Sequence, residues 1–393
     1  MLDAVLTQLR GRRDPMLAAI ERLCVVNSFT DNPEGGRKVG DLLAELCADI
    51  PSLRARPIDS PSARFAPHWL FRTPSAETSA EGAITIVGHL DTVFPPGTFE
   101  GFRLDGDIAR GPGVLDMKGG LVVAIEALRA LDRAGALADM KVILAIVSDE
   151  EVGSPEGRPL LQRELAGASA ALVLEAGRKA DMIITSRKGS AGVTAKSHGR
   201  AAHAGNSHKE GANAIWALAK LVDEAQNLTD YDRGITVNVG KFTGGQGKNT
   251  VPDAAEALMD FRFITTNDGE SVMEALRAAA ARAAASVPGT HIELGGGIAR
   301  TPLERTESNI ALYREYAMCA RAAGLGDGEA PLVGGGSDAS STSAIGIPSI
   351  DGLGPRGTGF HTKEELIETT TLAPKAEAIA RFLLARHTPR APA

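Results

Sequence analysis

The sequence predicts a two-domain α/β protein in which a small α+β domain is inserted into a larger one. Length is the first reason, because 393 residues exceed what one ordinary hydrophobic core holds. The second reason is the alternation of apolar strands and helices up to about residue 186, which is typical of a sheet covered by helices. The third is a change from about residue 183, after which strands of alternating polarity replace fully apolar ones.

Composition and charge narrow the class of protein. The chain is 43% hydrophobic and 23% charged, as soluble globular proteins are. A net charge of -7 argues against a nucleic-acid partner, since no basic face is needed to neutralise phosphates. Three widely spaced cysteines predict a reducing compartment rather than a disulfide framework. We see no signal peptide and no apolar run of about 20 residues, so we expect a cytoplasmic protein without a membrane partner.

The elements of the first part follow from helical spacing and from short apolar runs. In chain order we expect helices at 15–25 and 36–48, a strand at 84–88, a helix at 121–133, and strands at 141–147 and 171–174. The run at 141–147 is uninterrupted, which indicates a strand covered on both faces of its sheet.

The next part has the order β-α-β-β-α-β, which predicts a small antiparallel sheet with two helices on one face, a ferredoxin-like arrangement. We expect strands at 191–197, 235–241, 255–264 and 291–295, and helices at 211–226 and 269–286. Later, a helix at 308–323, a strand at 345–350 and a helix at 373–386 restore the α/β character. We therefore assign residues 1–186 plus 301–393 to the larger domain and residues 187–300 to the insert.

Polar side chains follow three of the predicted strands. His89 and Asp91 come after the first strand, Glu150 and Glu151 after the run at 141–147, and Glu175 after 171–174. His89 and Asp91 point the same way in an extended backbone, so Asp91 can orient the His89 ring through a hydrogen bond. Imidazoles and carboxylates at strand ends are typical of zinc-like metal sites.

Each candidate also has a plain structural interpretation. Asp116, amid glycine-rich turns, could form an Asx turn, or it could bridge two ions about 3.5–4 Å apart. Glu150 and Glu151 could form a solvated acidic loop, but crowding them without a cation would raise their pKa values. His361 in a glycine-rich loop is ordinary by itself. Together these residues predict a hydrolase with two metal ions.

Seven stretches, spread over nearly the whole chain, match a known pattern. They are Gly88–Val93, Gly111–Gly120, Ser148–Ser154, Leu174–Glu175, Ala202–Gly205, Gly334–Asp338 and Gly359–His361. In this order they resemble the di-zinc peptidase family of glutamate carboxypeptidase, acetylornithine deacetylase, succinyl-diaminopimelate desuccinylase and bacterial tripeptidase. The spacing of the acidic and glycine-rich stretches is most similar to glutamate carboxypeptidase.

The resemblance implies two zinc ions per subunit. One would be held by His89, Asp116 and Glu175, and the other by Asp116, Glu151 and His361. Asp116 then bridges the ions, Asp91 orients His89, and Glu150 is the general base. A cis peptide between Asp116 and Met117 is also implied.

The resemblance gives the inserted domain two roles, a lid and a homodimer contact. His203 would reach the partner's site and stabilise the oxyanion, unless it is only a turn histidine beside Gly205. Asn249 would contact substrate, and Arg300 or its rival Arg262 would bind the substrate carboxylate; either arginine could instead form a structural salt bridge. Without Cβ atoms, Gly335 and Gly336 would let the main chain approach the substrate closely.

The expected activity is zinc-dependent release of a C-terminal amino acid, glutamate above all, from a small N-acyl or peptidyl substrate. Deacylation of N-acyl amino acids is the alternative and uses identical chemistry, and hydrolysis of carbamoyl-type amides is a lesser one. From another class, a catalytically silent dimeric binding protein would predict a broken ligand set or a missing base.

Overall fold

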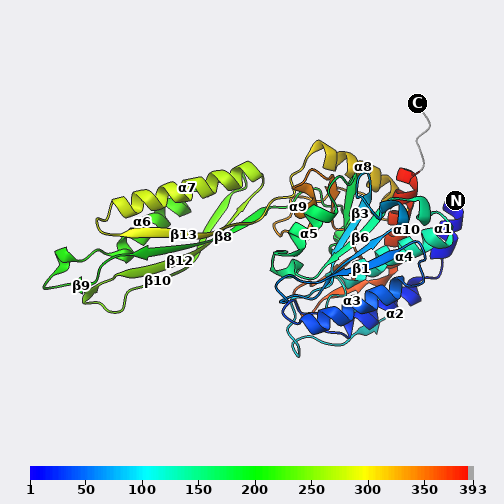
Figure 1. Cartoon of the computed structure of the whole chain (residues 1–393), viewed down its shortest axis with the longest axis horizontal. Helices are drawn as coiled ribbons and strands as arrows, with labels where there is room; N and C mark the ends of the chain where they lie inside the picture. The colour runs from blue at the N-terminus through cyan, green and yellow to red at the C-terminus, as the bar shows by residue number, and fades with distance from the viewer. Residues whose placement is uncertain (388–393) are drawn as a thin grey trace. The chain divides into compact units, whose positions relative to one another are not determined.

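The computed structural model describes residues 1–387 (Figure 1) and divides into two compact units. The larger unit comprises Met1–Ser186, Arg305–Leu332 and Ser337–Ala393, of which 388–393 lie outside the described residues. The inserted unit comprises Arg187–Glu304 and Val333–Gly336. The predicted class, an α/β domain carrying a smaller inserted α+β domain, is confirmed.

The larger unit is built on a six-stranded sheet of order β1-β2-β6-β3-β7-β14. Its strands are β1 (Arg54–Ile58), β2 (His68–Arg72), β6 (Val142–Val147), β3 (Ile84–His89), β7 (Ala170–Val173) and β14 (Ser349–Ile350). Strands β6, β3, β7 and β14 are parallel, whereas β2 runs antiparallel to β6. Parallel strands end at the same edge of a sheet, so the residues that follow β3, β6 and β7 emerge side by side.

Helices cover this sheet and explain why its central strands are fully buried. They are α1 (Leu2–Leu9), α2 (Arg13–Cys24), α3 (Pro33–Cys47), α4 (Lys118–Arg133), α5 (Gly157–Glu164), α8 (Glu307–Ala322), α9 (Ala339–Ser343) and α10 (Leu372–His387). Helix α4 packs against β3, α1, α2 and α10 and is buried along nearly its whole length. Asn32 caps α3 through the amide of Gly35, and Pro33 begins that helix.

A second sheet in the larger unit has the order β15-β16-β5-β4. It contains β15 (Gly357–Thr358), β16 (Leu366–Glu368), β5 (Ile108–Arg110) and β4 (Arg103–Asp105). Antiparallel pairing of β16 with β5 joins the end of the chain to the segment that leads into α4.

The inserted unit is an antiparallel sheet of order β10-β12-β8-β13 with helices α6 (Ala214–Gln226) and α7 (Thr266–Ala285). The strands are β8 (Gly189–His198), β10 (Thr236–Gly244), β12 (Ala254–Phe263) and β13 (His291–Arg300), and a short pair joins β9 (Ala202–His203) to β11 (Thr250–Val251). Burial alternates along β8 and β12, which gives each strand one face toward the helices. The order β-α-β-β-α-β is the predicted one.

Some expected boundaries differ. The strand predicted at 345–350 is only Ser349–Ile350, because the chain is still turning after α9. The strand predicted at 291–295 continues to Arg300 through a run of three glycines. Within residues 1–387, no helix combines the length and apolar character that crossing a membrane requires.

Candidate metal centre

The predicted metal ligands and the predicted base, Glu150, come together at one edge of the six-stranded sheet. His89 ends β3, Glu150 and Glu151 open a turn of 3₁₀ helix directly after β6, Glu175 follows β7, Asp116 precedes α4, and His361 lies between β15 and β16. Gly120 in the first turn of α4 permits this convergence, because a Cβ there would lie 2.4 Å from the carbonyl oxygen of Leu174. The peptide between Asp116 and Met117 is cis.

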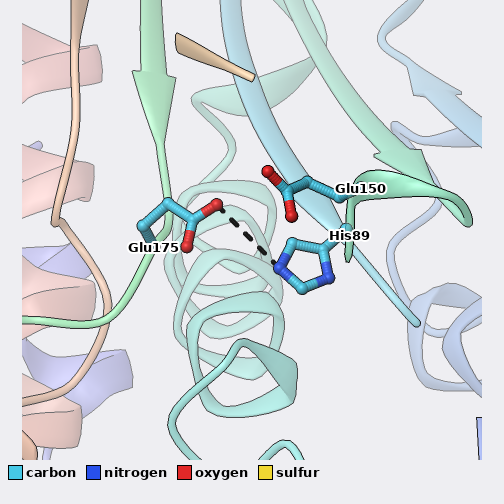
Figure 2. A group of neighbouring side chains, drawn as sticks. All are labelled: His89, Glu150 and Glu175. Carbon is cyan, nitrogen blue, oxygen red and sulfur yellow. Dashed lines mark ion pairs between the residues drawn. The ribbon is translucent and has the colours of Figure 1, made fainter. Parts of the chain in front are cut away.

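Asp116 lies between the two histidines and offers one carboxylate oxygen to each. Its Oδ1 is 3.2 Å from His89 Nε2, and its Oδ2 is 3.3 Å from His361 Nε2. His361 Nε2 is also 3.0 Å from Glu151 Oε2, and His89 Nε2 is 3.9 Å from Glu175 Oε1. Figure 2 shows Glu150 and Glu175 directed toward the His89 ring.

The donor set fits a pair of divalent cations. Ligand atoms about 2.0–2.1 Å from a tetrahedral zinc ion stand about 3.3 Å from one another, and three of the four separations lie close to that value. Within residues 1–387, ligand atoms of His89, Glu150 and Glu175 lie within 4.8 Å of one another, and so do those of His89, Asp116 and Glu151.

Burial and mutual repulsion perturb the carboxyl groups of this cluster. Burial, followed by the charges of Asp116 and Glu150, raises the pKa of Glu175 well above its usual value. Burial also raises the pKa of Glu151 to about 8, against the opposing hydrogen bond to His361. Burial opposes ionisation of Asp116 too, but hydrogen bonds to His361 and His89 outweigh it and lower that pKa. A divalent ion would relieve this excess of buried negative charge.

The pKa values of the two imidazoles are also raised, here by the neighbouring carboxylates. Burial disfavours the His89 cation, but hydrogen bonds to Asp116 and Asp91 raise the pKa of His89 well above its usual value. Hydrogen bonds to Asp116 and Glu151 raise the pKa of His361 to about 10. His361 also adopts a φ of 63°, a left-handed conformation that is uncommon outside glycine and often occurs at functional sites.

Asp91 lies behind His89 and has more partners than the sequence suggested. Its Oδ1 is 3.3 Å from His89 Nδ1, and its main-chain oxygen is 3.0 Å from the same nitrogen. Its carboxylate also accepts hydrogen bonds from the amides of Glu150 and Glu151, each at 3.2 Å, and from the Thr30 hydroxyl at 2.8 Å. Asp91 thus holds both the His89 ring and the acidic turn.

Sequence reasoning missed Glu365. Its buried carboxylate accepts hydrogen bonds from the amides of Gly113, Leu115 and Asp116, in the loop that carries the central carboxylate. The only signal in the sequence is an acidic pair shortly after His361, which reads equally well as a solvated turn.

The remaining predicted residues belong to the inserted unit. His203 lies in β9, and its Nδ1 accepts hydrogen bonds from the amides of Gly205 and Asn206, both at 3.1 Å. A neutral His203 ring therefore carries its proton on Nε2 and presents that atom as a donor. The Asn249 carbonyl accepts from the Ala204 amide, which places Asn249 beside His203 across β9 and β11.

The two candidate arginines have different surroundings. Arg262 forms a bidentate pair with Asp260, with N–O distances of 2.9 and 3.0 Å, which is the structural role considered for it. The stem of Arg300 passes over Gly336, where a Cβ would lie 2.6 Å from Arg300 Cδ. The neighbouring Gly335 carbonyl accepts a hydrogen bond from Arg187. The structure therefore groups Arg300 with the two predicted glycines.

Comparisons with known proteins found family models, related sequences and a solved structure that this chain resembles. Residues 185–288 match the peptidase dimerisation domain of the M20 family, and residues 71–231 match peptidase family M28. The chain is 26% identical to carboxypeptidase G2 of Pseudomonas sp. (strain RS-16), over 97% of this chain and 92% of that protein. It is 30% identical to succinyl-diaminopimelate desuccinylase of Paracoccus denitrificans, over 57% of this chain and 69% of that protein. The fold is similar to aminopeptidase PepT of Bacillus cereus, with a TM-score of 0.79, 23% identity, and 96% and 99% of the two chains covered.

Proposed function

The chain belongs to the M20 family of metallopeptidases, and on that premise we propose that it is a zinc-dependent exopeptidase releasing C-terminal glutamate from N-acyl or peptidyl substrates. The observation that carries this proposal is Asp116, placed between His89 and His361 with one oxygen toward each. The similarity to carboxypeptidase G2 over nearly the whole chain supports the choice of substrate class.

The proposed site uses the predicted ligand sets. His89, Asp116 and Glu175 would hold one ion, and Asp116, Glu151 and His361 the other. Two such ions supply Lewis-acid polarisation of an amide carbonyl and a water of lowered pKa. Zinc suits a set of imidazoles and carboxylates better than magnesium or calcium, which prefer oxygen ligands alone.

Glu150 is the proposed general base. Its carboxylate lies beside His89 and Glu175, and its backbone amide is held by Asp91. From there Glu150 takes a proton from the attacking water and later returns it to the leaving amine, a type of transfer typically worth about 10²–10⁴-fold in rate. Asp91 positions this base and the His89 ring together.

Dimerisation would complete the site. Strand β10 is an open edge of the inserted sheet and contacts α6. Phe242 of β10 is 40% exposed, and Trp216 of α6 is 55% exposed. An open strand edge, together with exposed aromatic side chains on that strand and on the helix it contacts, favours pairing with a second copy of the chain. His203 of the partner subunit would then donate from Nε2 to the oxyanion, a contact worth about 3–4 kcal/mol.

Arg300 is the proposed group for the substrate carboxylate. A guanidinium binds a carboxylate through two parallel hydrogen bonds and so fixes the position of the C-terminal residue. Arg262 is the weaker candidate, because Asp260 already engages two of its nitrogens. Gly335, Gly336 and Asn249 would contribute polar contacts to the same substrate. Three free cysteines support a cytoplasmic location.

A panel of N-acyl amino acids with one common acyl group tests the proposal. We expect the highest kcat/KM for the glutamate member and loss of activity after metal removal. The similarity to the desuccinylase favours a second candidate, an N-acyl amino acid deacylase. Higher activity on N-succinyl or N-acetyl basic amino acids than on acyl-glutamates would establish that alternative. A protein that holds two ions but hydrolyses none of these compounds would be a binding protein.

A further inference from the structure

Glu365 is a buried carboxylate whose hydrogen bonds all point into one loop. Its Oε1 accepts from the amides of Leu115 at 2.8 Å and Asp116 at 2.9 Å, and its Oε2 accepts from the amide of Gly113 at 3.1 Å. The residue is 0% exposed. A buried carboxylate is costly unless its oxygens are satisfied, and three amide donors provide that compensation.

The loop that Glu365 binds is the one that delivers Asp116. The segment from Gly113 to Asp116 belongs to no strand or helix, so these amides have no ladder of their own. Gly113 adopts a φ of 77°, which allows the turn into this loop. Three bonds from one side chain therefore replace the main-chain pairing that would otherwise hold Asp116 in place.

Glu365 is also tied to the second histidine. It lies four residues after His361 and directly before β16, which pairs with β5 through Leu366 and Arg110. This short segment contains His361 of the metal cluster, then Glu365, which binds the Asp116 loop through three hydrogen bonds, and then the first residue of β16. Glu365 and the pairing of β16 with β5 therefore connect the segment that carries His361 to the loop that carries Asp116.

We infer that Glu365 is a positioning residue that holds Asp116 in its bridging orientation before any ion binds and links it to His361. This inference rests on the proposed metal site. With the Asp116 amide fixed, the carboxylate keeps Oδ1 toward His89 and Oδ2 toward His361. Pre-organisation of this kind lowers the ordering that binding would otherwise require, and partners behind metal ligands typically affect affinity about 10–100-fold.

The substitution Glu365→Gln tests this role. A glutamine retains one acceptor oxygen, and its NH₂ group must face an amide donor, so at least one of the three bonds is lost. The matched control is Glu364→Gln, which changes the adjacent carboxylate, 85% exposed at its side chain, in the same way. The readouts are the zinc dissociation constant from chelator competition and the visible spectrum of the cobalt-loaded protein.

We expect Glu365→Gln to bind zinc about 10–100-fold more weakly, with an altered cobalt spectrum, and excess metal to restore most of kcat. Glu364→Gln should match the wild type. A zinc dissociation constant for Glu365→Gln within twofold of wild type would overturn the inference, even if the thermal midpoint falls. A wild-type protein that binds no metal would instead contradict the proposed function.

A measurement on the wild type covers the case in which Glu365→Gln does not fold. In metal-free protein, hydrogen exchange at the amides of Leu115 and Asp116 should be slow, because Glu365 holds both before an ion arrives. Exchange at the rate of an unprotected loop would show that the hydrogen bonds from these amides to Glu365 form only when the metal is bound, and the inference would be wrong.

Discussion

Metal binding should release protons, and the number follows from the perturbed groups in the site. In metal-free protein, hydrogen bonds to carboxylates raise the pKa of His361 to about 10 and that of His89 well above its usual value, which favours the protonated form of both imidazoles. The pKa of Glu151 is raised to about 8 and that of Glu175 well above normal. Each proposed ion would therefore meet one protonated imidazole and one carboxyl group with a raised pKa.

The expected release is between about one and two protons per ion. The metal affinity should rise with pH, because each ligand must lose its proton before it can bind the ion. Each proton released makes affinity about tenfold greater per pH unit. Between pH 6.5 and pH 7.5 we therefore expect the affinity for each ion to rise about 10- to 100-fold.

Calorimetric titration with zinc in two buffers of different ionisation enthalpy measures this proton count directly. The control is His208→Gln, which removes a histidine of the inserted unit and should release the same number of protons. Release of less than about half a proton per ion, or an affinity unchanged from pH 6 to pH 8, would refute the reasoning that the metal-free ligands hold protons which the ions displace.

Three further predictions concern single side chains. Glu150→Gln should lower kcat at least about 100-fold while two ions remain bound, as metal analysis of the purified variant would show. Asp91→Asn removes a hydrogen-bond acceptor from the His89 ring or from the acidic turn, so zinc should bind about 10–100-fold more weakly in chelator competition. The control Asp59→Asn, on the surface, should leave the zinc affinity unchanged. Phe242→Asp places a charge on the exposed edge of β10 and should shift the protein toward monomers in analytical ultracentrifugation; a dimer of unchanged stability would exclude that edge.

Elements with a strong local pattern were predictable. The apolar run at 141–147 became β6, and the order of strands and helices in the insert was read correctly from alternation and helical spacing. Strand β1 was missed because it is almost wholly exposed, with arginines at Arg54 and Arg56, and so has no buried face to recognise. Charged residues of this kind are common on edge strands.

The site was predictable where a ligand directly follows a buried strand, as His89 follows β3. His361 is half exposed on a loop, so its place in the pattern came from the resemblance to a family and not from any local signal. Glu365 could not be found in either way. Its hydrogen bonds reach residues about 250 positions earlier in the chain, and only folding brings those segments together.

The division into two units separates the proposed roles. Every candidate metal ligand belongs to the larger unit, and Arg300, Asn249, Gly335 and Gly336 belong to the inserted one. Residues 333–336 belong to the inserted unit although the residues before and after them in the sequence belong to the larger one. The reason is that Arg187 pairs with Val333 and donates a hydrogen bond to Gly335. The glycine loop and Arg300 therefore form one group without a metal ligand. Substitutions in that group should alter KM and leave zinc affinity unchanged. When one of them is combined with Glu365→Gln, the changes in the free energy of catalysis should add, since sites without shared partners behave independently.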